Sequence, residues 1–65
     1  MKLQEAHIQA EKCHFIIMKT DADNEVPWVC RCLEYPWALG EGRTGSEAFE
    51  DCFDDTIKQI LKSDR

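Results

Sequence analysis

Four cysteines and one histidine are the side chains of this sequence that most readily suggest chemistry. They are Cys13, His14, Cys30, Cys32 and Cys52, and thiolate and imidazole groups are common zinc ligands. Tetrahedral zinc sites, however, usually take paired ligands from Cys-x2–4-Cys turns. Cys30 and Cys32 are two positions apart in a predicted strand, so both lie on the face that also carries Trp28. We therefore expect the thiols to pack as small apolar side chains, with no metal ion and no cofactor.

Candidates for catalysis are few. Cys13 and His14 are neighbours in a predicted strand, so their side chains should point to opposite faces and not form a nucleophile–base pair. Asp54 and Asp55 lack a companion acid or metal-ligand set at a recognisable spacing. The glycines fit neither phosphate-loop pattern. The sequence predicts a protein that is not an enzyme. The alternative is a relic of a metal-dependent nuclease that uses Asp54 and Asp55.

Acidic side chains gather in the C-terminal part of the chain. They are Glu41, Glu47, Glu50, Asp51, Asp54 and Asp55. Three like-charged pairs stand four residues apart, which destabilises a helix. They are Glu47 with Asp51, Glu50 with Asp54, and Asp51 with Asp55. This unfavourable spacing favours a functional interpretation, an anionic face that binds a basic partner and speeds its association. A solvated helix face without a partner is the alternative.

Size and charge limit the possible functions. The chain has 65 residues, with 13 acidic against 8 basic side chains and a net charge of -5. A domain this small buries only about 60% of its unfolded surface and is marginally stable. Its acidity argues against binding nucleic acid or an anionic membrane and is compatible with a basic protein partner.

The cellular compartment can be inferred from the cysteines and the apolar segments. Four cysteines are an even number, so a secreted disulfide scaffold has to be considered. The N-terminus, however, has no apolar signal core, and the longest apolar run, residues 15–18, is too short to cross a bilayer. We expect a cytoplasmic protein with reduced thiols.

The C-terminal segment predicts an amphipathic helix. Thr44 and Glu47 have the spacing of a capping box, in which each side chain bonds the backbone N–H of the other residue. Apolar or small side chains then recur every three or four residues, as expected for a helix packed on a flat surface. They are Ala48, Phe49, Cys52, Phe53, Thr56, Ile57, Ile60 and Leu61.

The remaining elements precede this helix. Residues 13–20 and 26–34 predict two strands that pair as a hairpin, and residues 37–41 predict a short third strand. Residues 2–12 favour a first helix, although a strand that starts near Ile8 is an alternative. The expected fold is one α+β domain, with a three-stranded antiparallel sheet packed on the C-terminal helix in the order α-β-β-β-α.

Two surfaces of the predicted sheet suggest interactions. Strand alternation places Trp28 towards the helix and Val29 and Leu33 on the opposite, uncovered face. An uncovered apolar face invites self-association, and a two-fold homodimer is the commonest closed form. Trp37, just after a proline turn, is a candidate interface anchor or else a rim residue that covers the core.

The order of these motifs resembles the HicB antitoxin family. Trp28-Val29 stands where the family has an aromatic pair, Glu34-Tyr35-Pro36 where its turn begins, Gly42-Arg43-Thr44 at its Gly-Asp-Thr, and Ser46-Glu47-Ala48 at its helix start. The resemblance covers about residues 13–61. Trp37 replaces the turn glycine of the family.

This resemblance implies a partner-binding domain. The family role is to block a small, basic, RNA-cleaving toxin of the HicA type. The helix-turn-helix or ribbon-helix-helix segment with which many such antitoxins bind their operator is not found here, so the resemblance does not imply operator binding. The alternatives are a phage-borne or stand-alone relative with another target and a structural homo-oligomer.

Overall fold

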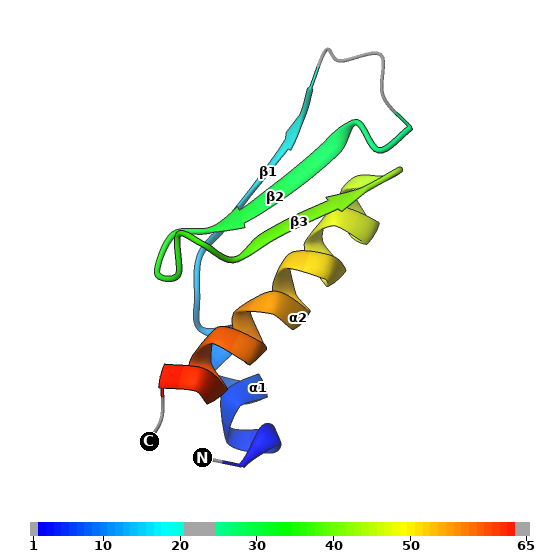
Figure 1. Ribbon diagram of the computed structural model, residues 1–65. Helices are drawn as coiled ribbons and strands as arrows, with labels where there is room; N and C mark the ends of the chain where they lie inside the picture. Colours follow the sequence, from blue (N-terminus) through cyan, green and yellow to red (C-terminus); the bar gives the residue numbers. More distant parts are fainter. Residues whose placement is uncertain (1, 21–24, 64–65) are drawn as a thin grey trace.

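The computed structural model describes residues 2–20 and 25–63 of the chain. Two helices and three strands follow one another: α1 (Leu3–Glu11), β1 (Phe15–Lys19), β2 (Trp28–Cys32), β3 (Leu39–Gly42) and α2 (Gly45–Ser63) (Figure 1). The predicted α-β-β-β-α order is confirmed, and the first segment is a helix rather than a strand. The turn expected between the first two strands lies largely outside the described residues.

The three strands form an antiparallel sheet in the order β1-β2-β3. Cys30 pairs with Ile17 of β1 and with Gly40 of β3, so these three residues lie on the same face. That face packs on α2, and both Cys30 and Cys32 are buried in it, as strand alternation predicts.

The third strand begins later than the sequence predicts. Trp37 lies in a turn rather than in β3, because the Ala38 N–H donates to the Tyr35 carbonyl at 2.8 Å and closes the chain around Pro36. Proline favours the second position of such a turn. The prediction that Trp37 opens the third strand is therefore wrong.

Two apolar clusters share the long helix α2. The first, between the sheet and α2, contains Cys30, Cys32, Ala38, Ala48 and Cys52. The second, between the two helices, contains Ala6, Ala10, Ile57 and Ile60. Tyr35 packs against both. In Figure 1 the sheet lies along the N-terminal half of α2, and α1 lies beside its C-terminal half. The first helix therefore packs on the second helix and not on the sheet.

Aromatic rings connect α1 and β1 to α2. Phe15 meets Phe49 edge to face at 5.1 Å between centroids, and Phe49 stacks with Phe53 at 5.7 Å. His7 meets Phe53 edge to face at 5.0 Å. Such pairs each contribute about 0.5–1.5 kcal/mol beyond the area they bury.

The backbone of β3 lies directly against the backbone of α2. A methyl group on Gly40 would overlap the carbonyl oxygen of Ala48 and the amide nitrogen of Cys52, and one on Gly42 would overlap Glu47 and Ala48. Only glycine allows so close an approach at these two positions. The helix is thereby held under the edge of the sheet.

Among the described residues, no helix is both long enough and apolar enough to cross a membrane.

We expect Gly40→Ala to lower the free energy of unfolding by about 1–3 kcal/mol, because the added methyl group meets backbone atoms that cannot move aside. Gly45→Ala is the matched control, since a methyl group there would make ordinary contacts of 3.5 Å with Ile17 and Trp28. Urea unfolding measures both. Equal stability of the two variants would contradict the close approach of β3 and α2.

Candidate functional site

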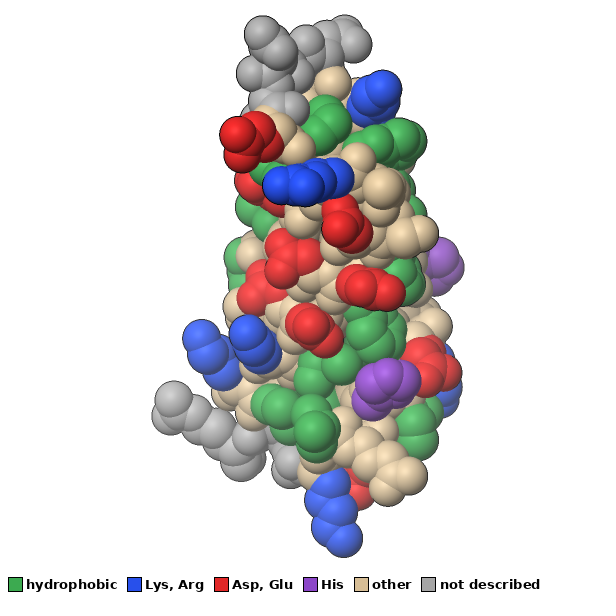
Figure 2. All heavy atoms as spheres, turned by 90° about the vertical axis from the view of Figure 1, so that its right-hand side faces the viewer, with side chains coloured by type: hydrophobic (Ala, Val, Ile, Leu, Met, Phe, Trp, Pro, Cys, Tyr) green, Lys and Arg blue, Asp and Glu red, His purple; other side chains and the backbone are tan. Residues whose placement is uncertain are grey.

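An open groove of about 530 Å³ lies between the end of β3 and the N-terminal half of α2. Its lining contains most of the acidic residues predicted to bind a partner, namely Glu41, Glu47, Glu50, Asp51 and Asp54. Arg43 is the cationic residue of the lining. Figure 2, which views the molecule from the α2 side, shows the carboxylate side chains gathered on this surface. We call it the acidic groove.

Three acids of α2 bond backbone N–H groups of β3 and of the residue that follows it. The donor and acceptor pairs are Leu39 N–H with Asp55 Oδ2 (3.2 Å), Glu41 N–H with Asp51 Oδ2 (3.0 Å) and Arg43 N–H with Glu47 Oε2 (2.8 Å). We call Glu47, Asp51 and Asp55 the carboxylate row. Asp55, which does not line the groove, belongs to the same surface through this row.

The carboxylate row matches the strand in spacing. Alternate N–H groups of a strand point to the same edge, about 6.8 Å apart. Positions four apart on a helix are separated by about 6.0 Å. Because α2 runs antiparallel to β3, each step of two residues along the strand meets a step of four back along the helix. The repulsive spacing of Glu47, Asp51 and Asp55 is thus the spacing required to bond every second N–H.

The row gives these acids a structural role that was not predicted from the sequence, since they support the edge of β3. Edge N–H groups that find no partner are a template for pairing with another strand, and on β3 these groups are already bonded. Within the described residues, the side chains of Glu41, Glu50 and Asp54 make no hydrogen bond or ion pair. These three carboxylates are therefore not used in supporting β3.

The capping box forms only in part. Thr44 Oγ1 accepts the N–H of Glu47 at 3.2 Å, as the spacing predicts. The Glu47 carboxylate, however, bonds the N–H of Arg43 and not that of Thr44. The reason is geometric: Arg43 occupies the next position in phase with Leu39 and Glu41 along the outer edge.

Trp37 does not join the acidic groove. It is 68% exposed and lies in the turn before β3, at the opposite end of that strand from Gly42 and Arg43. The structure therefore separates the predicted aromatic anchor from most of the predicted acidic residues.

The sheet face away from α2 is uncovered. Val29 lines a shallow apolar depression of about 320 Å³ on it, together with Met18, Arg31 and Leu39. Leu33, just beyond β2, is exposed. Strand alternation thus places Val29 as predicted on an open face, and β1 and β3 add Met18 and Leu39 to it.

Three of the four thiols, those of Cys30, Cys32 and Cys52, are buried in the core. Cys30 and Cys52 are fully buried, and the Cys52 thiol donates to the Ala38 carbonyl at 3.6 Å. Burial raises the pKa of Cys52 to about 12 and also raises the pKa of Cys30. Both side chains therefore remain neutral and pack as small apolar groups, as expected from the sequence.

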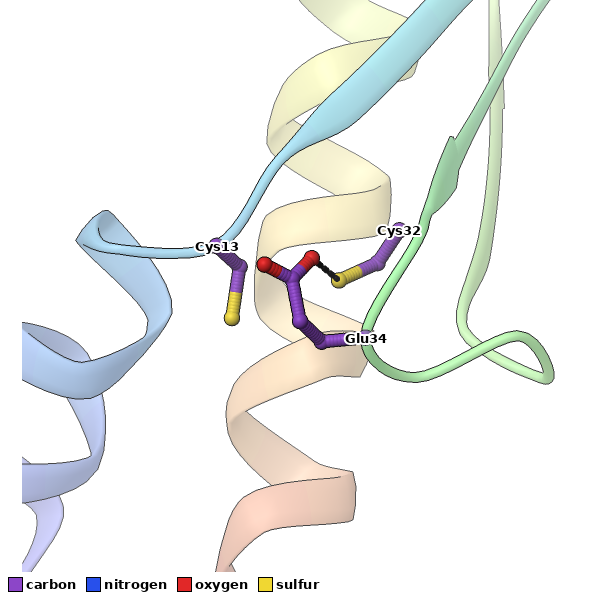
Figure 3. Close-up of side chains that lie close together, drawn as sticks. All are labelled: Cys13, Cys32 and Glu34. Atoms are coloured by element: carbon purple, nitrogen blue, oxygen red, sulfur yellow. Dashed lines mark hydrogen bonds between the residues drawn. The ribbon is translucent and has the colours of Figure 1, made fainter.

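Cys13 and Cys32 have different surroundings, because Glu34 lies between them (Figure 3). The two sulfurs and a carboxylate oxygen of Glu34 lie within 4.8 Å of one another. Burial, then the neighbouring Cys32 and Glu34, raises the pKa of Cys13 to about 11. We call these three residues the thiol–carboxylate cluster.

His14 fixes the Glu34 carboxylate in this cluster. Its backbone N–H donates to both carboxylate oxygens, at 2.9 and 3.2 Å, and its Nδ1 lies 2.8 Å from Oε2. These bonds, the backbone bond first, lower the pKa of Glu34. Cys13 and His14 therefore meet the same carboxylate, although as neighbours in a strand they were expected to face apart; β1 begins only at Phe15.

Glu34 was not predicted from the sequence to be part of a site. The available signal was its spacing from Cys32, since residues two apart at a strand end share a face. Its proximity to Cys13 depends on where α1 ends, which the sequence pattern does not specify.

No family model, curated protein or solved structure matches this chain. The resemblance to HicB antitoxins therefore rests on the motif residues alone.

We expect Asp51→Ala to destabilise the fold by about 1 kcal/mol, because losing a charged hydrogen bond outweighs the relief of like-charge repulsion. Glu50→Ala is the control: it also removes a like-charged neighbour but breaks no hydrogen bond, so its stability should be unchanged or slightly higher. Chemical denaturation compares the two. If Asp51→Ala were the more stable variant, the carboxylate row would not support β3.

Proposed function

We propose that this chain is a small non-enzymatic protein-binding module that engages a basic protein through the acidic groove. The observation that carries the proposal is that the acids fall into two groups, one bonded to the backbone of β3 and one without a bond. The carboxylate row is bonded to β3 and holds it against α2. Among the described residues, the carboxylates of Glu41, Glu50 and Asp54 make no such bond and line the groove between the two elements.

The groove has the properties expected of a docking site for cationic side chains. It is concave and open, and a carboxylate accepts the planar guanidinium of arginine through two parallel hydrogen bonds. The overall charge of -5 adds long-range attraction, which accelerates encounter with a basic surface and weakens as salt is added.

The resemblance to HicB antitoxins suggests which basic protein this is. A protein that binds or cleaves RNA needs a cationic surface to hold phosphates. Closely spaced carboxylates can occupy such a surface in place of the phosphates and so inhibit it. An antitoxin or inhibitor of a HicA-type toxin, or of another nucleic-acid-binding protein, is the function we favour.

The test is capture of a partner from the native host followed by charge reversal in the groove. The doubly substituted variant Glu50→Lys/Asp54→Lys should weaken binding of the captured protein by at least about tenfold at low salt, chiefly by slowing association. Glu5→Lys, an exposed acid on α1 away from the groove, should retain most of the affinity. Surface plasmon resonance at several salt concentrations measures both.

Two results would refute this function. One is the absence of any stoichiometric basic partner in the captured material. The other is a partner for which Glu5→Lys, with half the change in charge, costs about half the binding free energy that the groove variant costs (about threefold in affinity against tenfold), since that would reduce the effect to net charge.

Self-association on the open sheet face is a second proposal, supported by the exposure of Met18 (47%) and Leu39 (59%) there. Arg31 and Glu41 lie on this same face by strand pairing. Under a two-fold axis the cation of one copy can meet the acid of the other, so the patch complements itself. A homodimer built face to face would leave Glu50 and Asp54 of the acidic groove free, while Glu41 would take part in the dimer contact.

We expect a homodimer at micromolar concentration that Val29→Lys or Leu33→Lys weakens without unfolding the chain, because a buried ammonium group opposes the interface. Ile8→Lys, which replaces an exposed apolar residue of α1, is the matched control. Sedimentation velocity resolves the two species. A wild-type protein that stays monomeric at high concentration would assign the face to a different partner.

A further inference from the structure

The thiol–carboxylate cluster is the feature that the proposed function leaves unused. Cys13 follows α1, Cys32 ends β2 and Glu34 lies two residues further on. Figure 3 shows the carboxylate between the two thiol side chains. We propose that Cys13, Cys32 and Glu34 bind one zinc ion.

The donor atoms suit zinc. Two thiolates and one carboxylate oxygen are a soft, borderline set that zinc accepts and that calcium and magnesium, which prefer oxygen ligands throughout, do not. Tetrahedral coordination at the usual bond lengths separates neighbouring ligand atoms by about 3.5–3.8 Å. Cys32 Sγ already lies 3.9 Å from Glu34 Oε1. Since all three atoms lie within 4.8 Å of one another, small rotations of the side chains suffice.

His14 provides the outer support that zinc ligands usually have. Its Nδ1 contacts Oε2 of Glu34, whereas the Cys32 thiol faces Oε1. The backbone N–H of His14 bonds both oxygens as well, so His14 holds the carboxylate in an orientation in which Oε1 also faces the sulfur. Such partners tune metal affinity and are often as sensitive to mutation as the ligands themselves. Among the described residues, no lysine or arginine side chain pairs with Glu34 and competes for the place of a metal cation.

The cluster is open on one side. Cys32 is buried, but Cys13 is only half-buried and the side chain of Glu34 is 39% exposed. An ion can enter from solvent, and a water molecule can supply the fourth ligand. Binding displaces the two thiol protons to solvent as the two Zn–S bonds form, and no oxidant or reductant is required.

The sequence-based expectation of no metal rested on Cys30 and Cys32 as a pair. The structure pairs the thiols differently: Cys30 lies with Cys52 inside the core, and Cys32, at the edge of that core, lies with Cys13 beside a carboxylate. Cys52 therefore offers a matched control thiol within the same fold.

A zinc ion at this place would cross-link two segments that are distant in the sequence. It would join the connection between α1 and β1 to the end of β2, close to Tyr35, where the two apolar clusters meet. Domains this small often gain their missing stability from such a metal.

The test uses the full chain, reduced, stripped with a chelator and then mixed with one equivalent of zinc chloride. Native mass spectrometry should show one bound zinc, and competition with a chromophoric chelator gives the affinity. We expect Cys13→Ser to weaken zinc binding by at least about 100-fold, and Glu34→Gln and His14→Ala by about 10–100-fold. Cys52→Ala should stay within about twofold of wild type.

Thermal unfolding supplies a second reading, since a ligand that binds only the native state raises the midpoint as its concentration rises. That rise should be present in wild type and Cys52→Ala and absent in Cys13→Ser. If Cys13→Ser does not fold, Glu34→Gln decides the question. The proposal is overturned if reduced wild type retains no zinc, if Glu34→Gln binds zinc as tightly as wild type, or if loss of Cys52 removes the metal equally. A Cys13–Cys32 disulfide in place of bound metal would also overturn it.

Discussion

The contact between the backbones of β3 and α2 is the constraint on which the rest of the structure depends. Gly40 and Gly42 leave no side chain between strand and helix, so α2 lies close under the edge of the sheet. Only at that separation can the short side chains of Asp51 and Asp55 reach the edge N–H groups. Larger residues in β3 would move the helix away and break these bonds, and the acidic groove beside them would lose its geometry. The acidic surface is therefore a consequence of the glycine contact.

The two halves of the long helix α2 pack against different elements and are held unequally well. Its N-terminal half packs on the sheet, while its C-terminal half packs on α1, through Ala6 and Ala10, and on Tyr35. Small side chains let the two helices approach but bury little apolar area each. Few elements link the two parts: the Phe15–Phe49–Phe53 rings, Tyr35, and the connection that carries Cys13. An additional link at the junction between these two parts would therefore add most to the stability of the domain.

The sequence predicted the fold because its local signals agree with one another. Alternation placed Cys30 and Cys32 towards the helix, and the apolar stripe after Thr44 predicted α2. What it could not predict depends on register between distant segments. Neither the alignment of Asp51 with Glu41 nor the proximity of Cys13 to Glu34 follows from local pattern, because each requires two elements to be placed in space first. The like-charged spacing on α2 was recognised as unusual, but its cause became visible only beside β3.

The carboxylate row also determines how a partner can bind. On the outer edge of β3 the N–H groups of Leu39 and Glu41 are already bonded, so a partner cannot extend the sheet there by strand pairing. On β1, alternation turns the N–H of Ile17 away from β2, and among the described residues it has no hydrogen-bond partner. The two edges are therefore chemically different. A partner of the proposed kind would thus meet side-chain charge on the α2 side, an interaction sensitive to salt, whereas the described residues of β1 offer unbonded main-chain N–H groups.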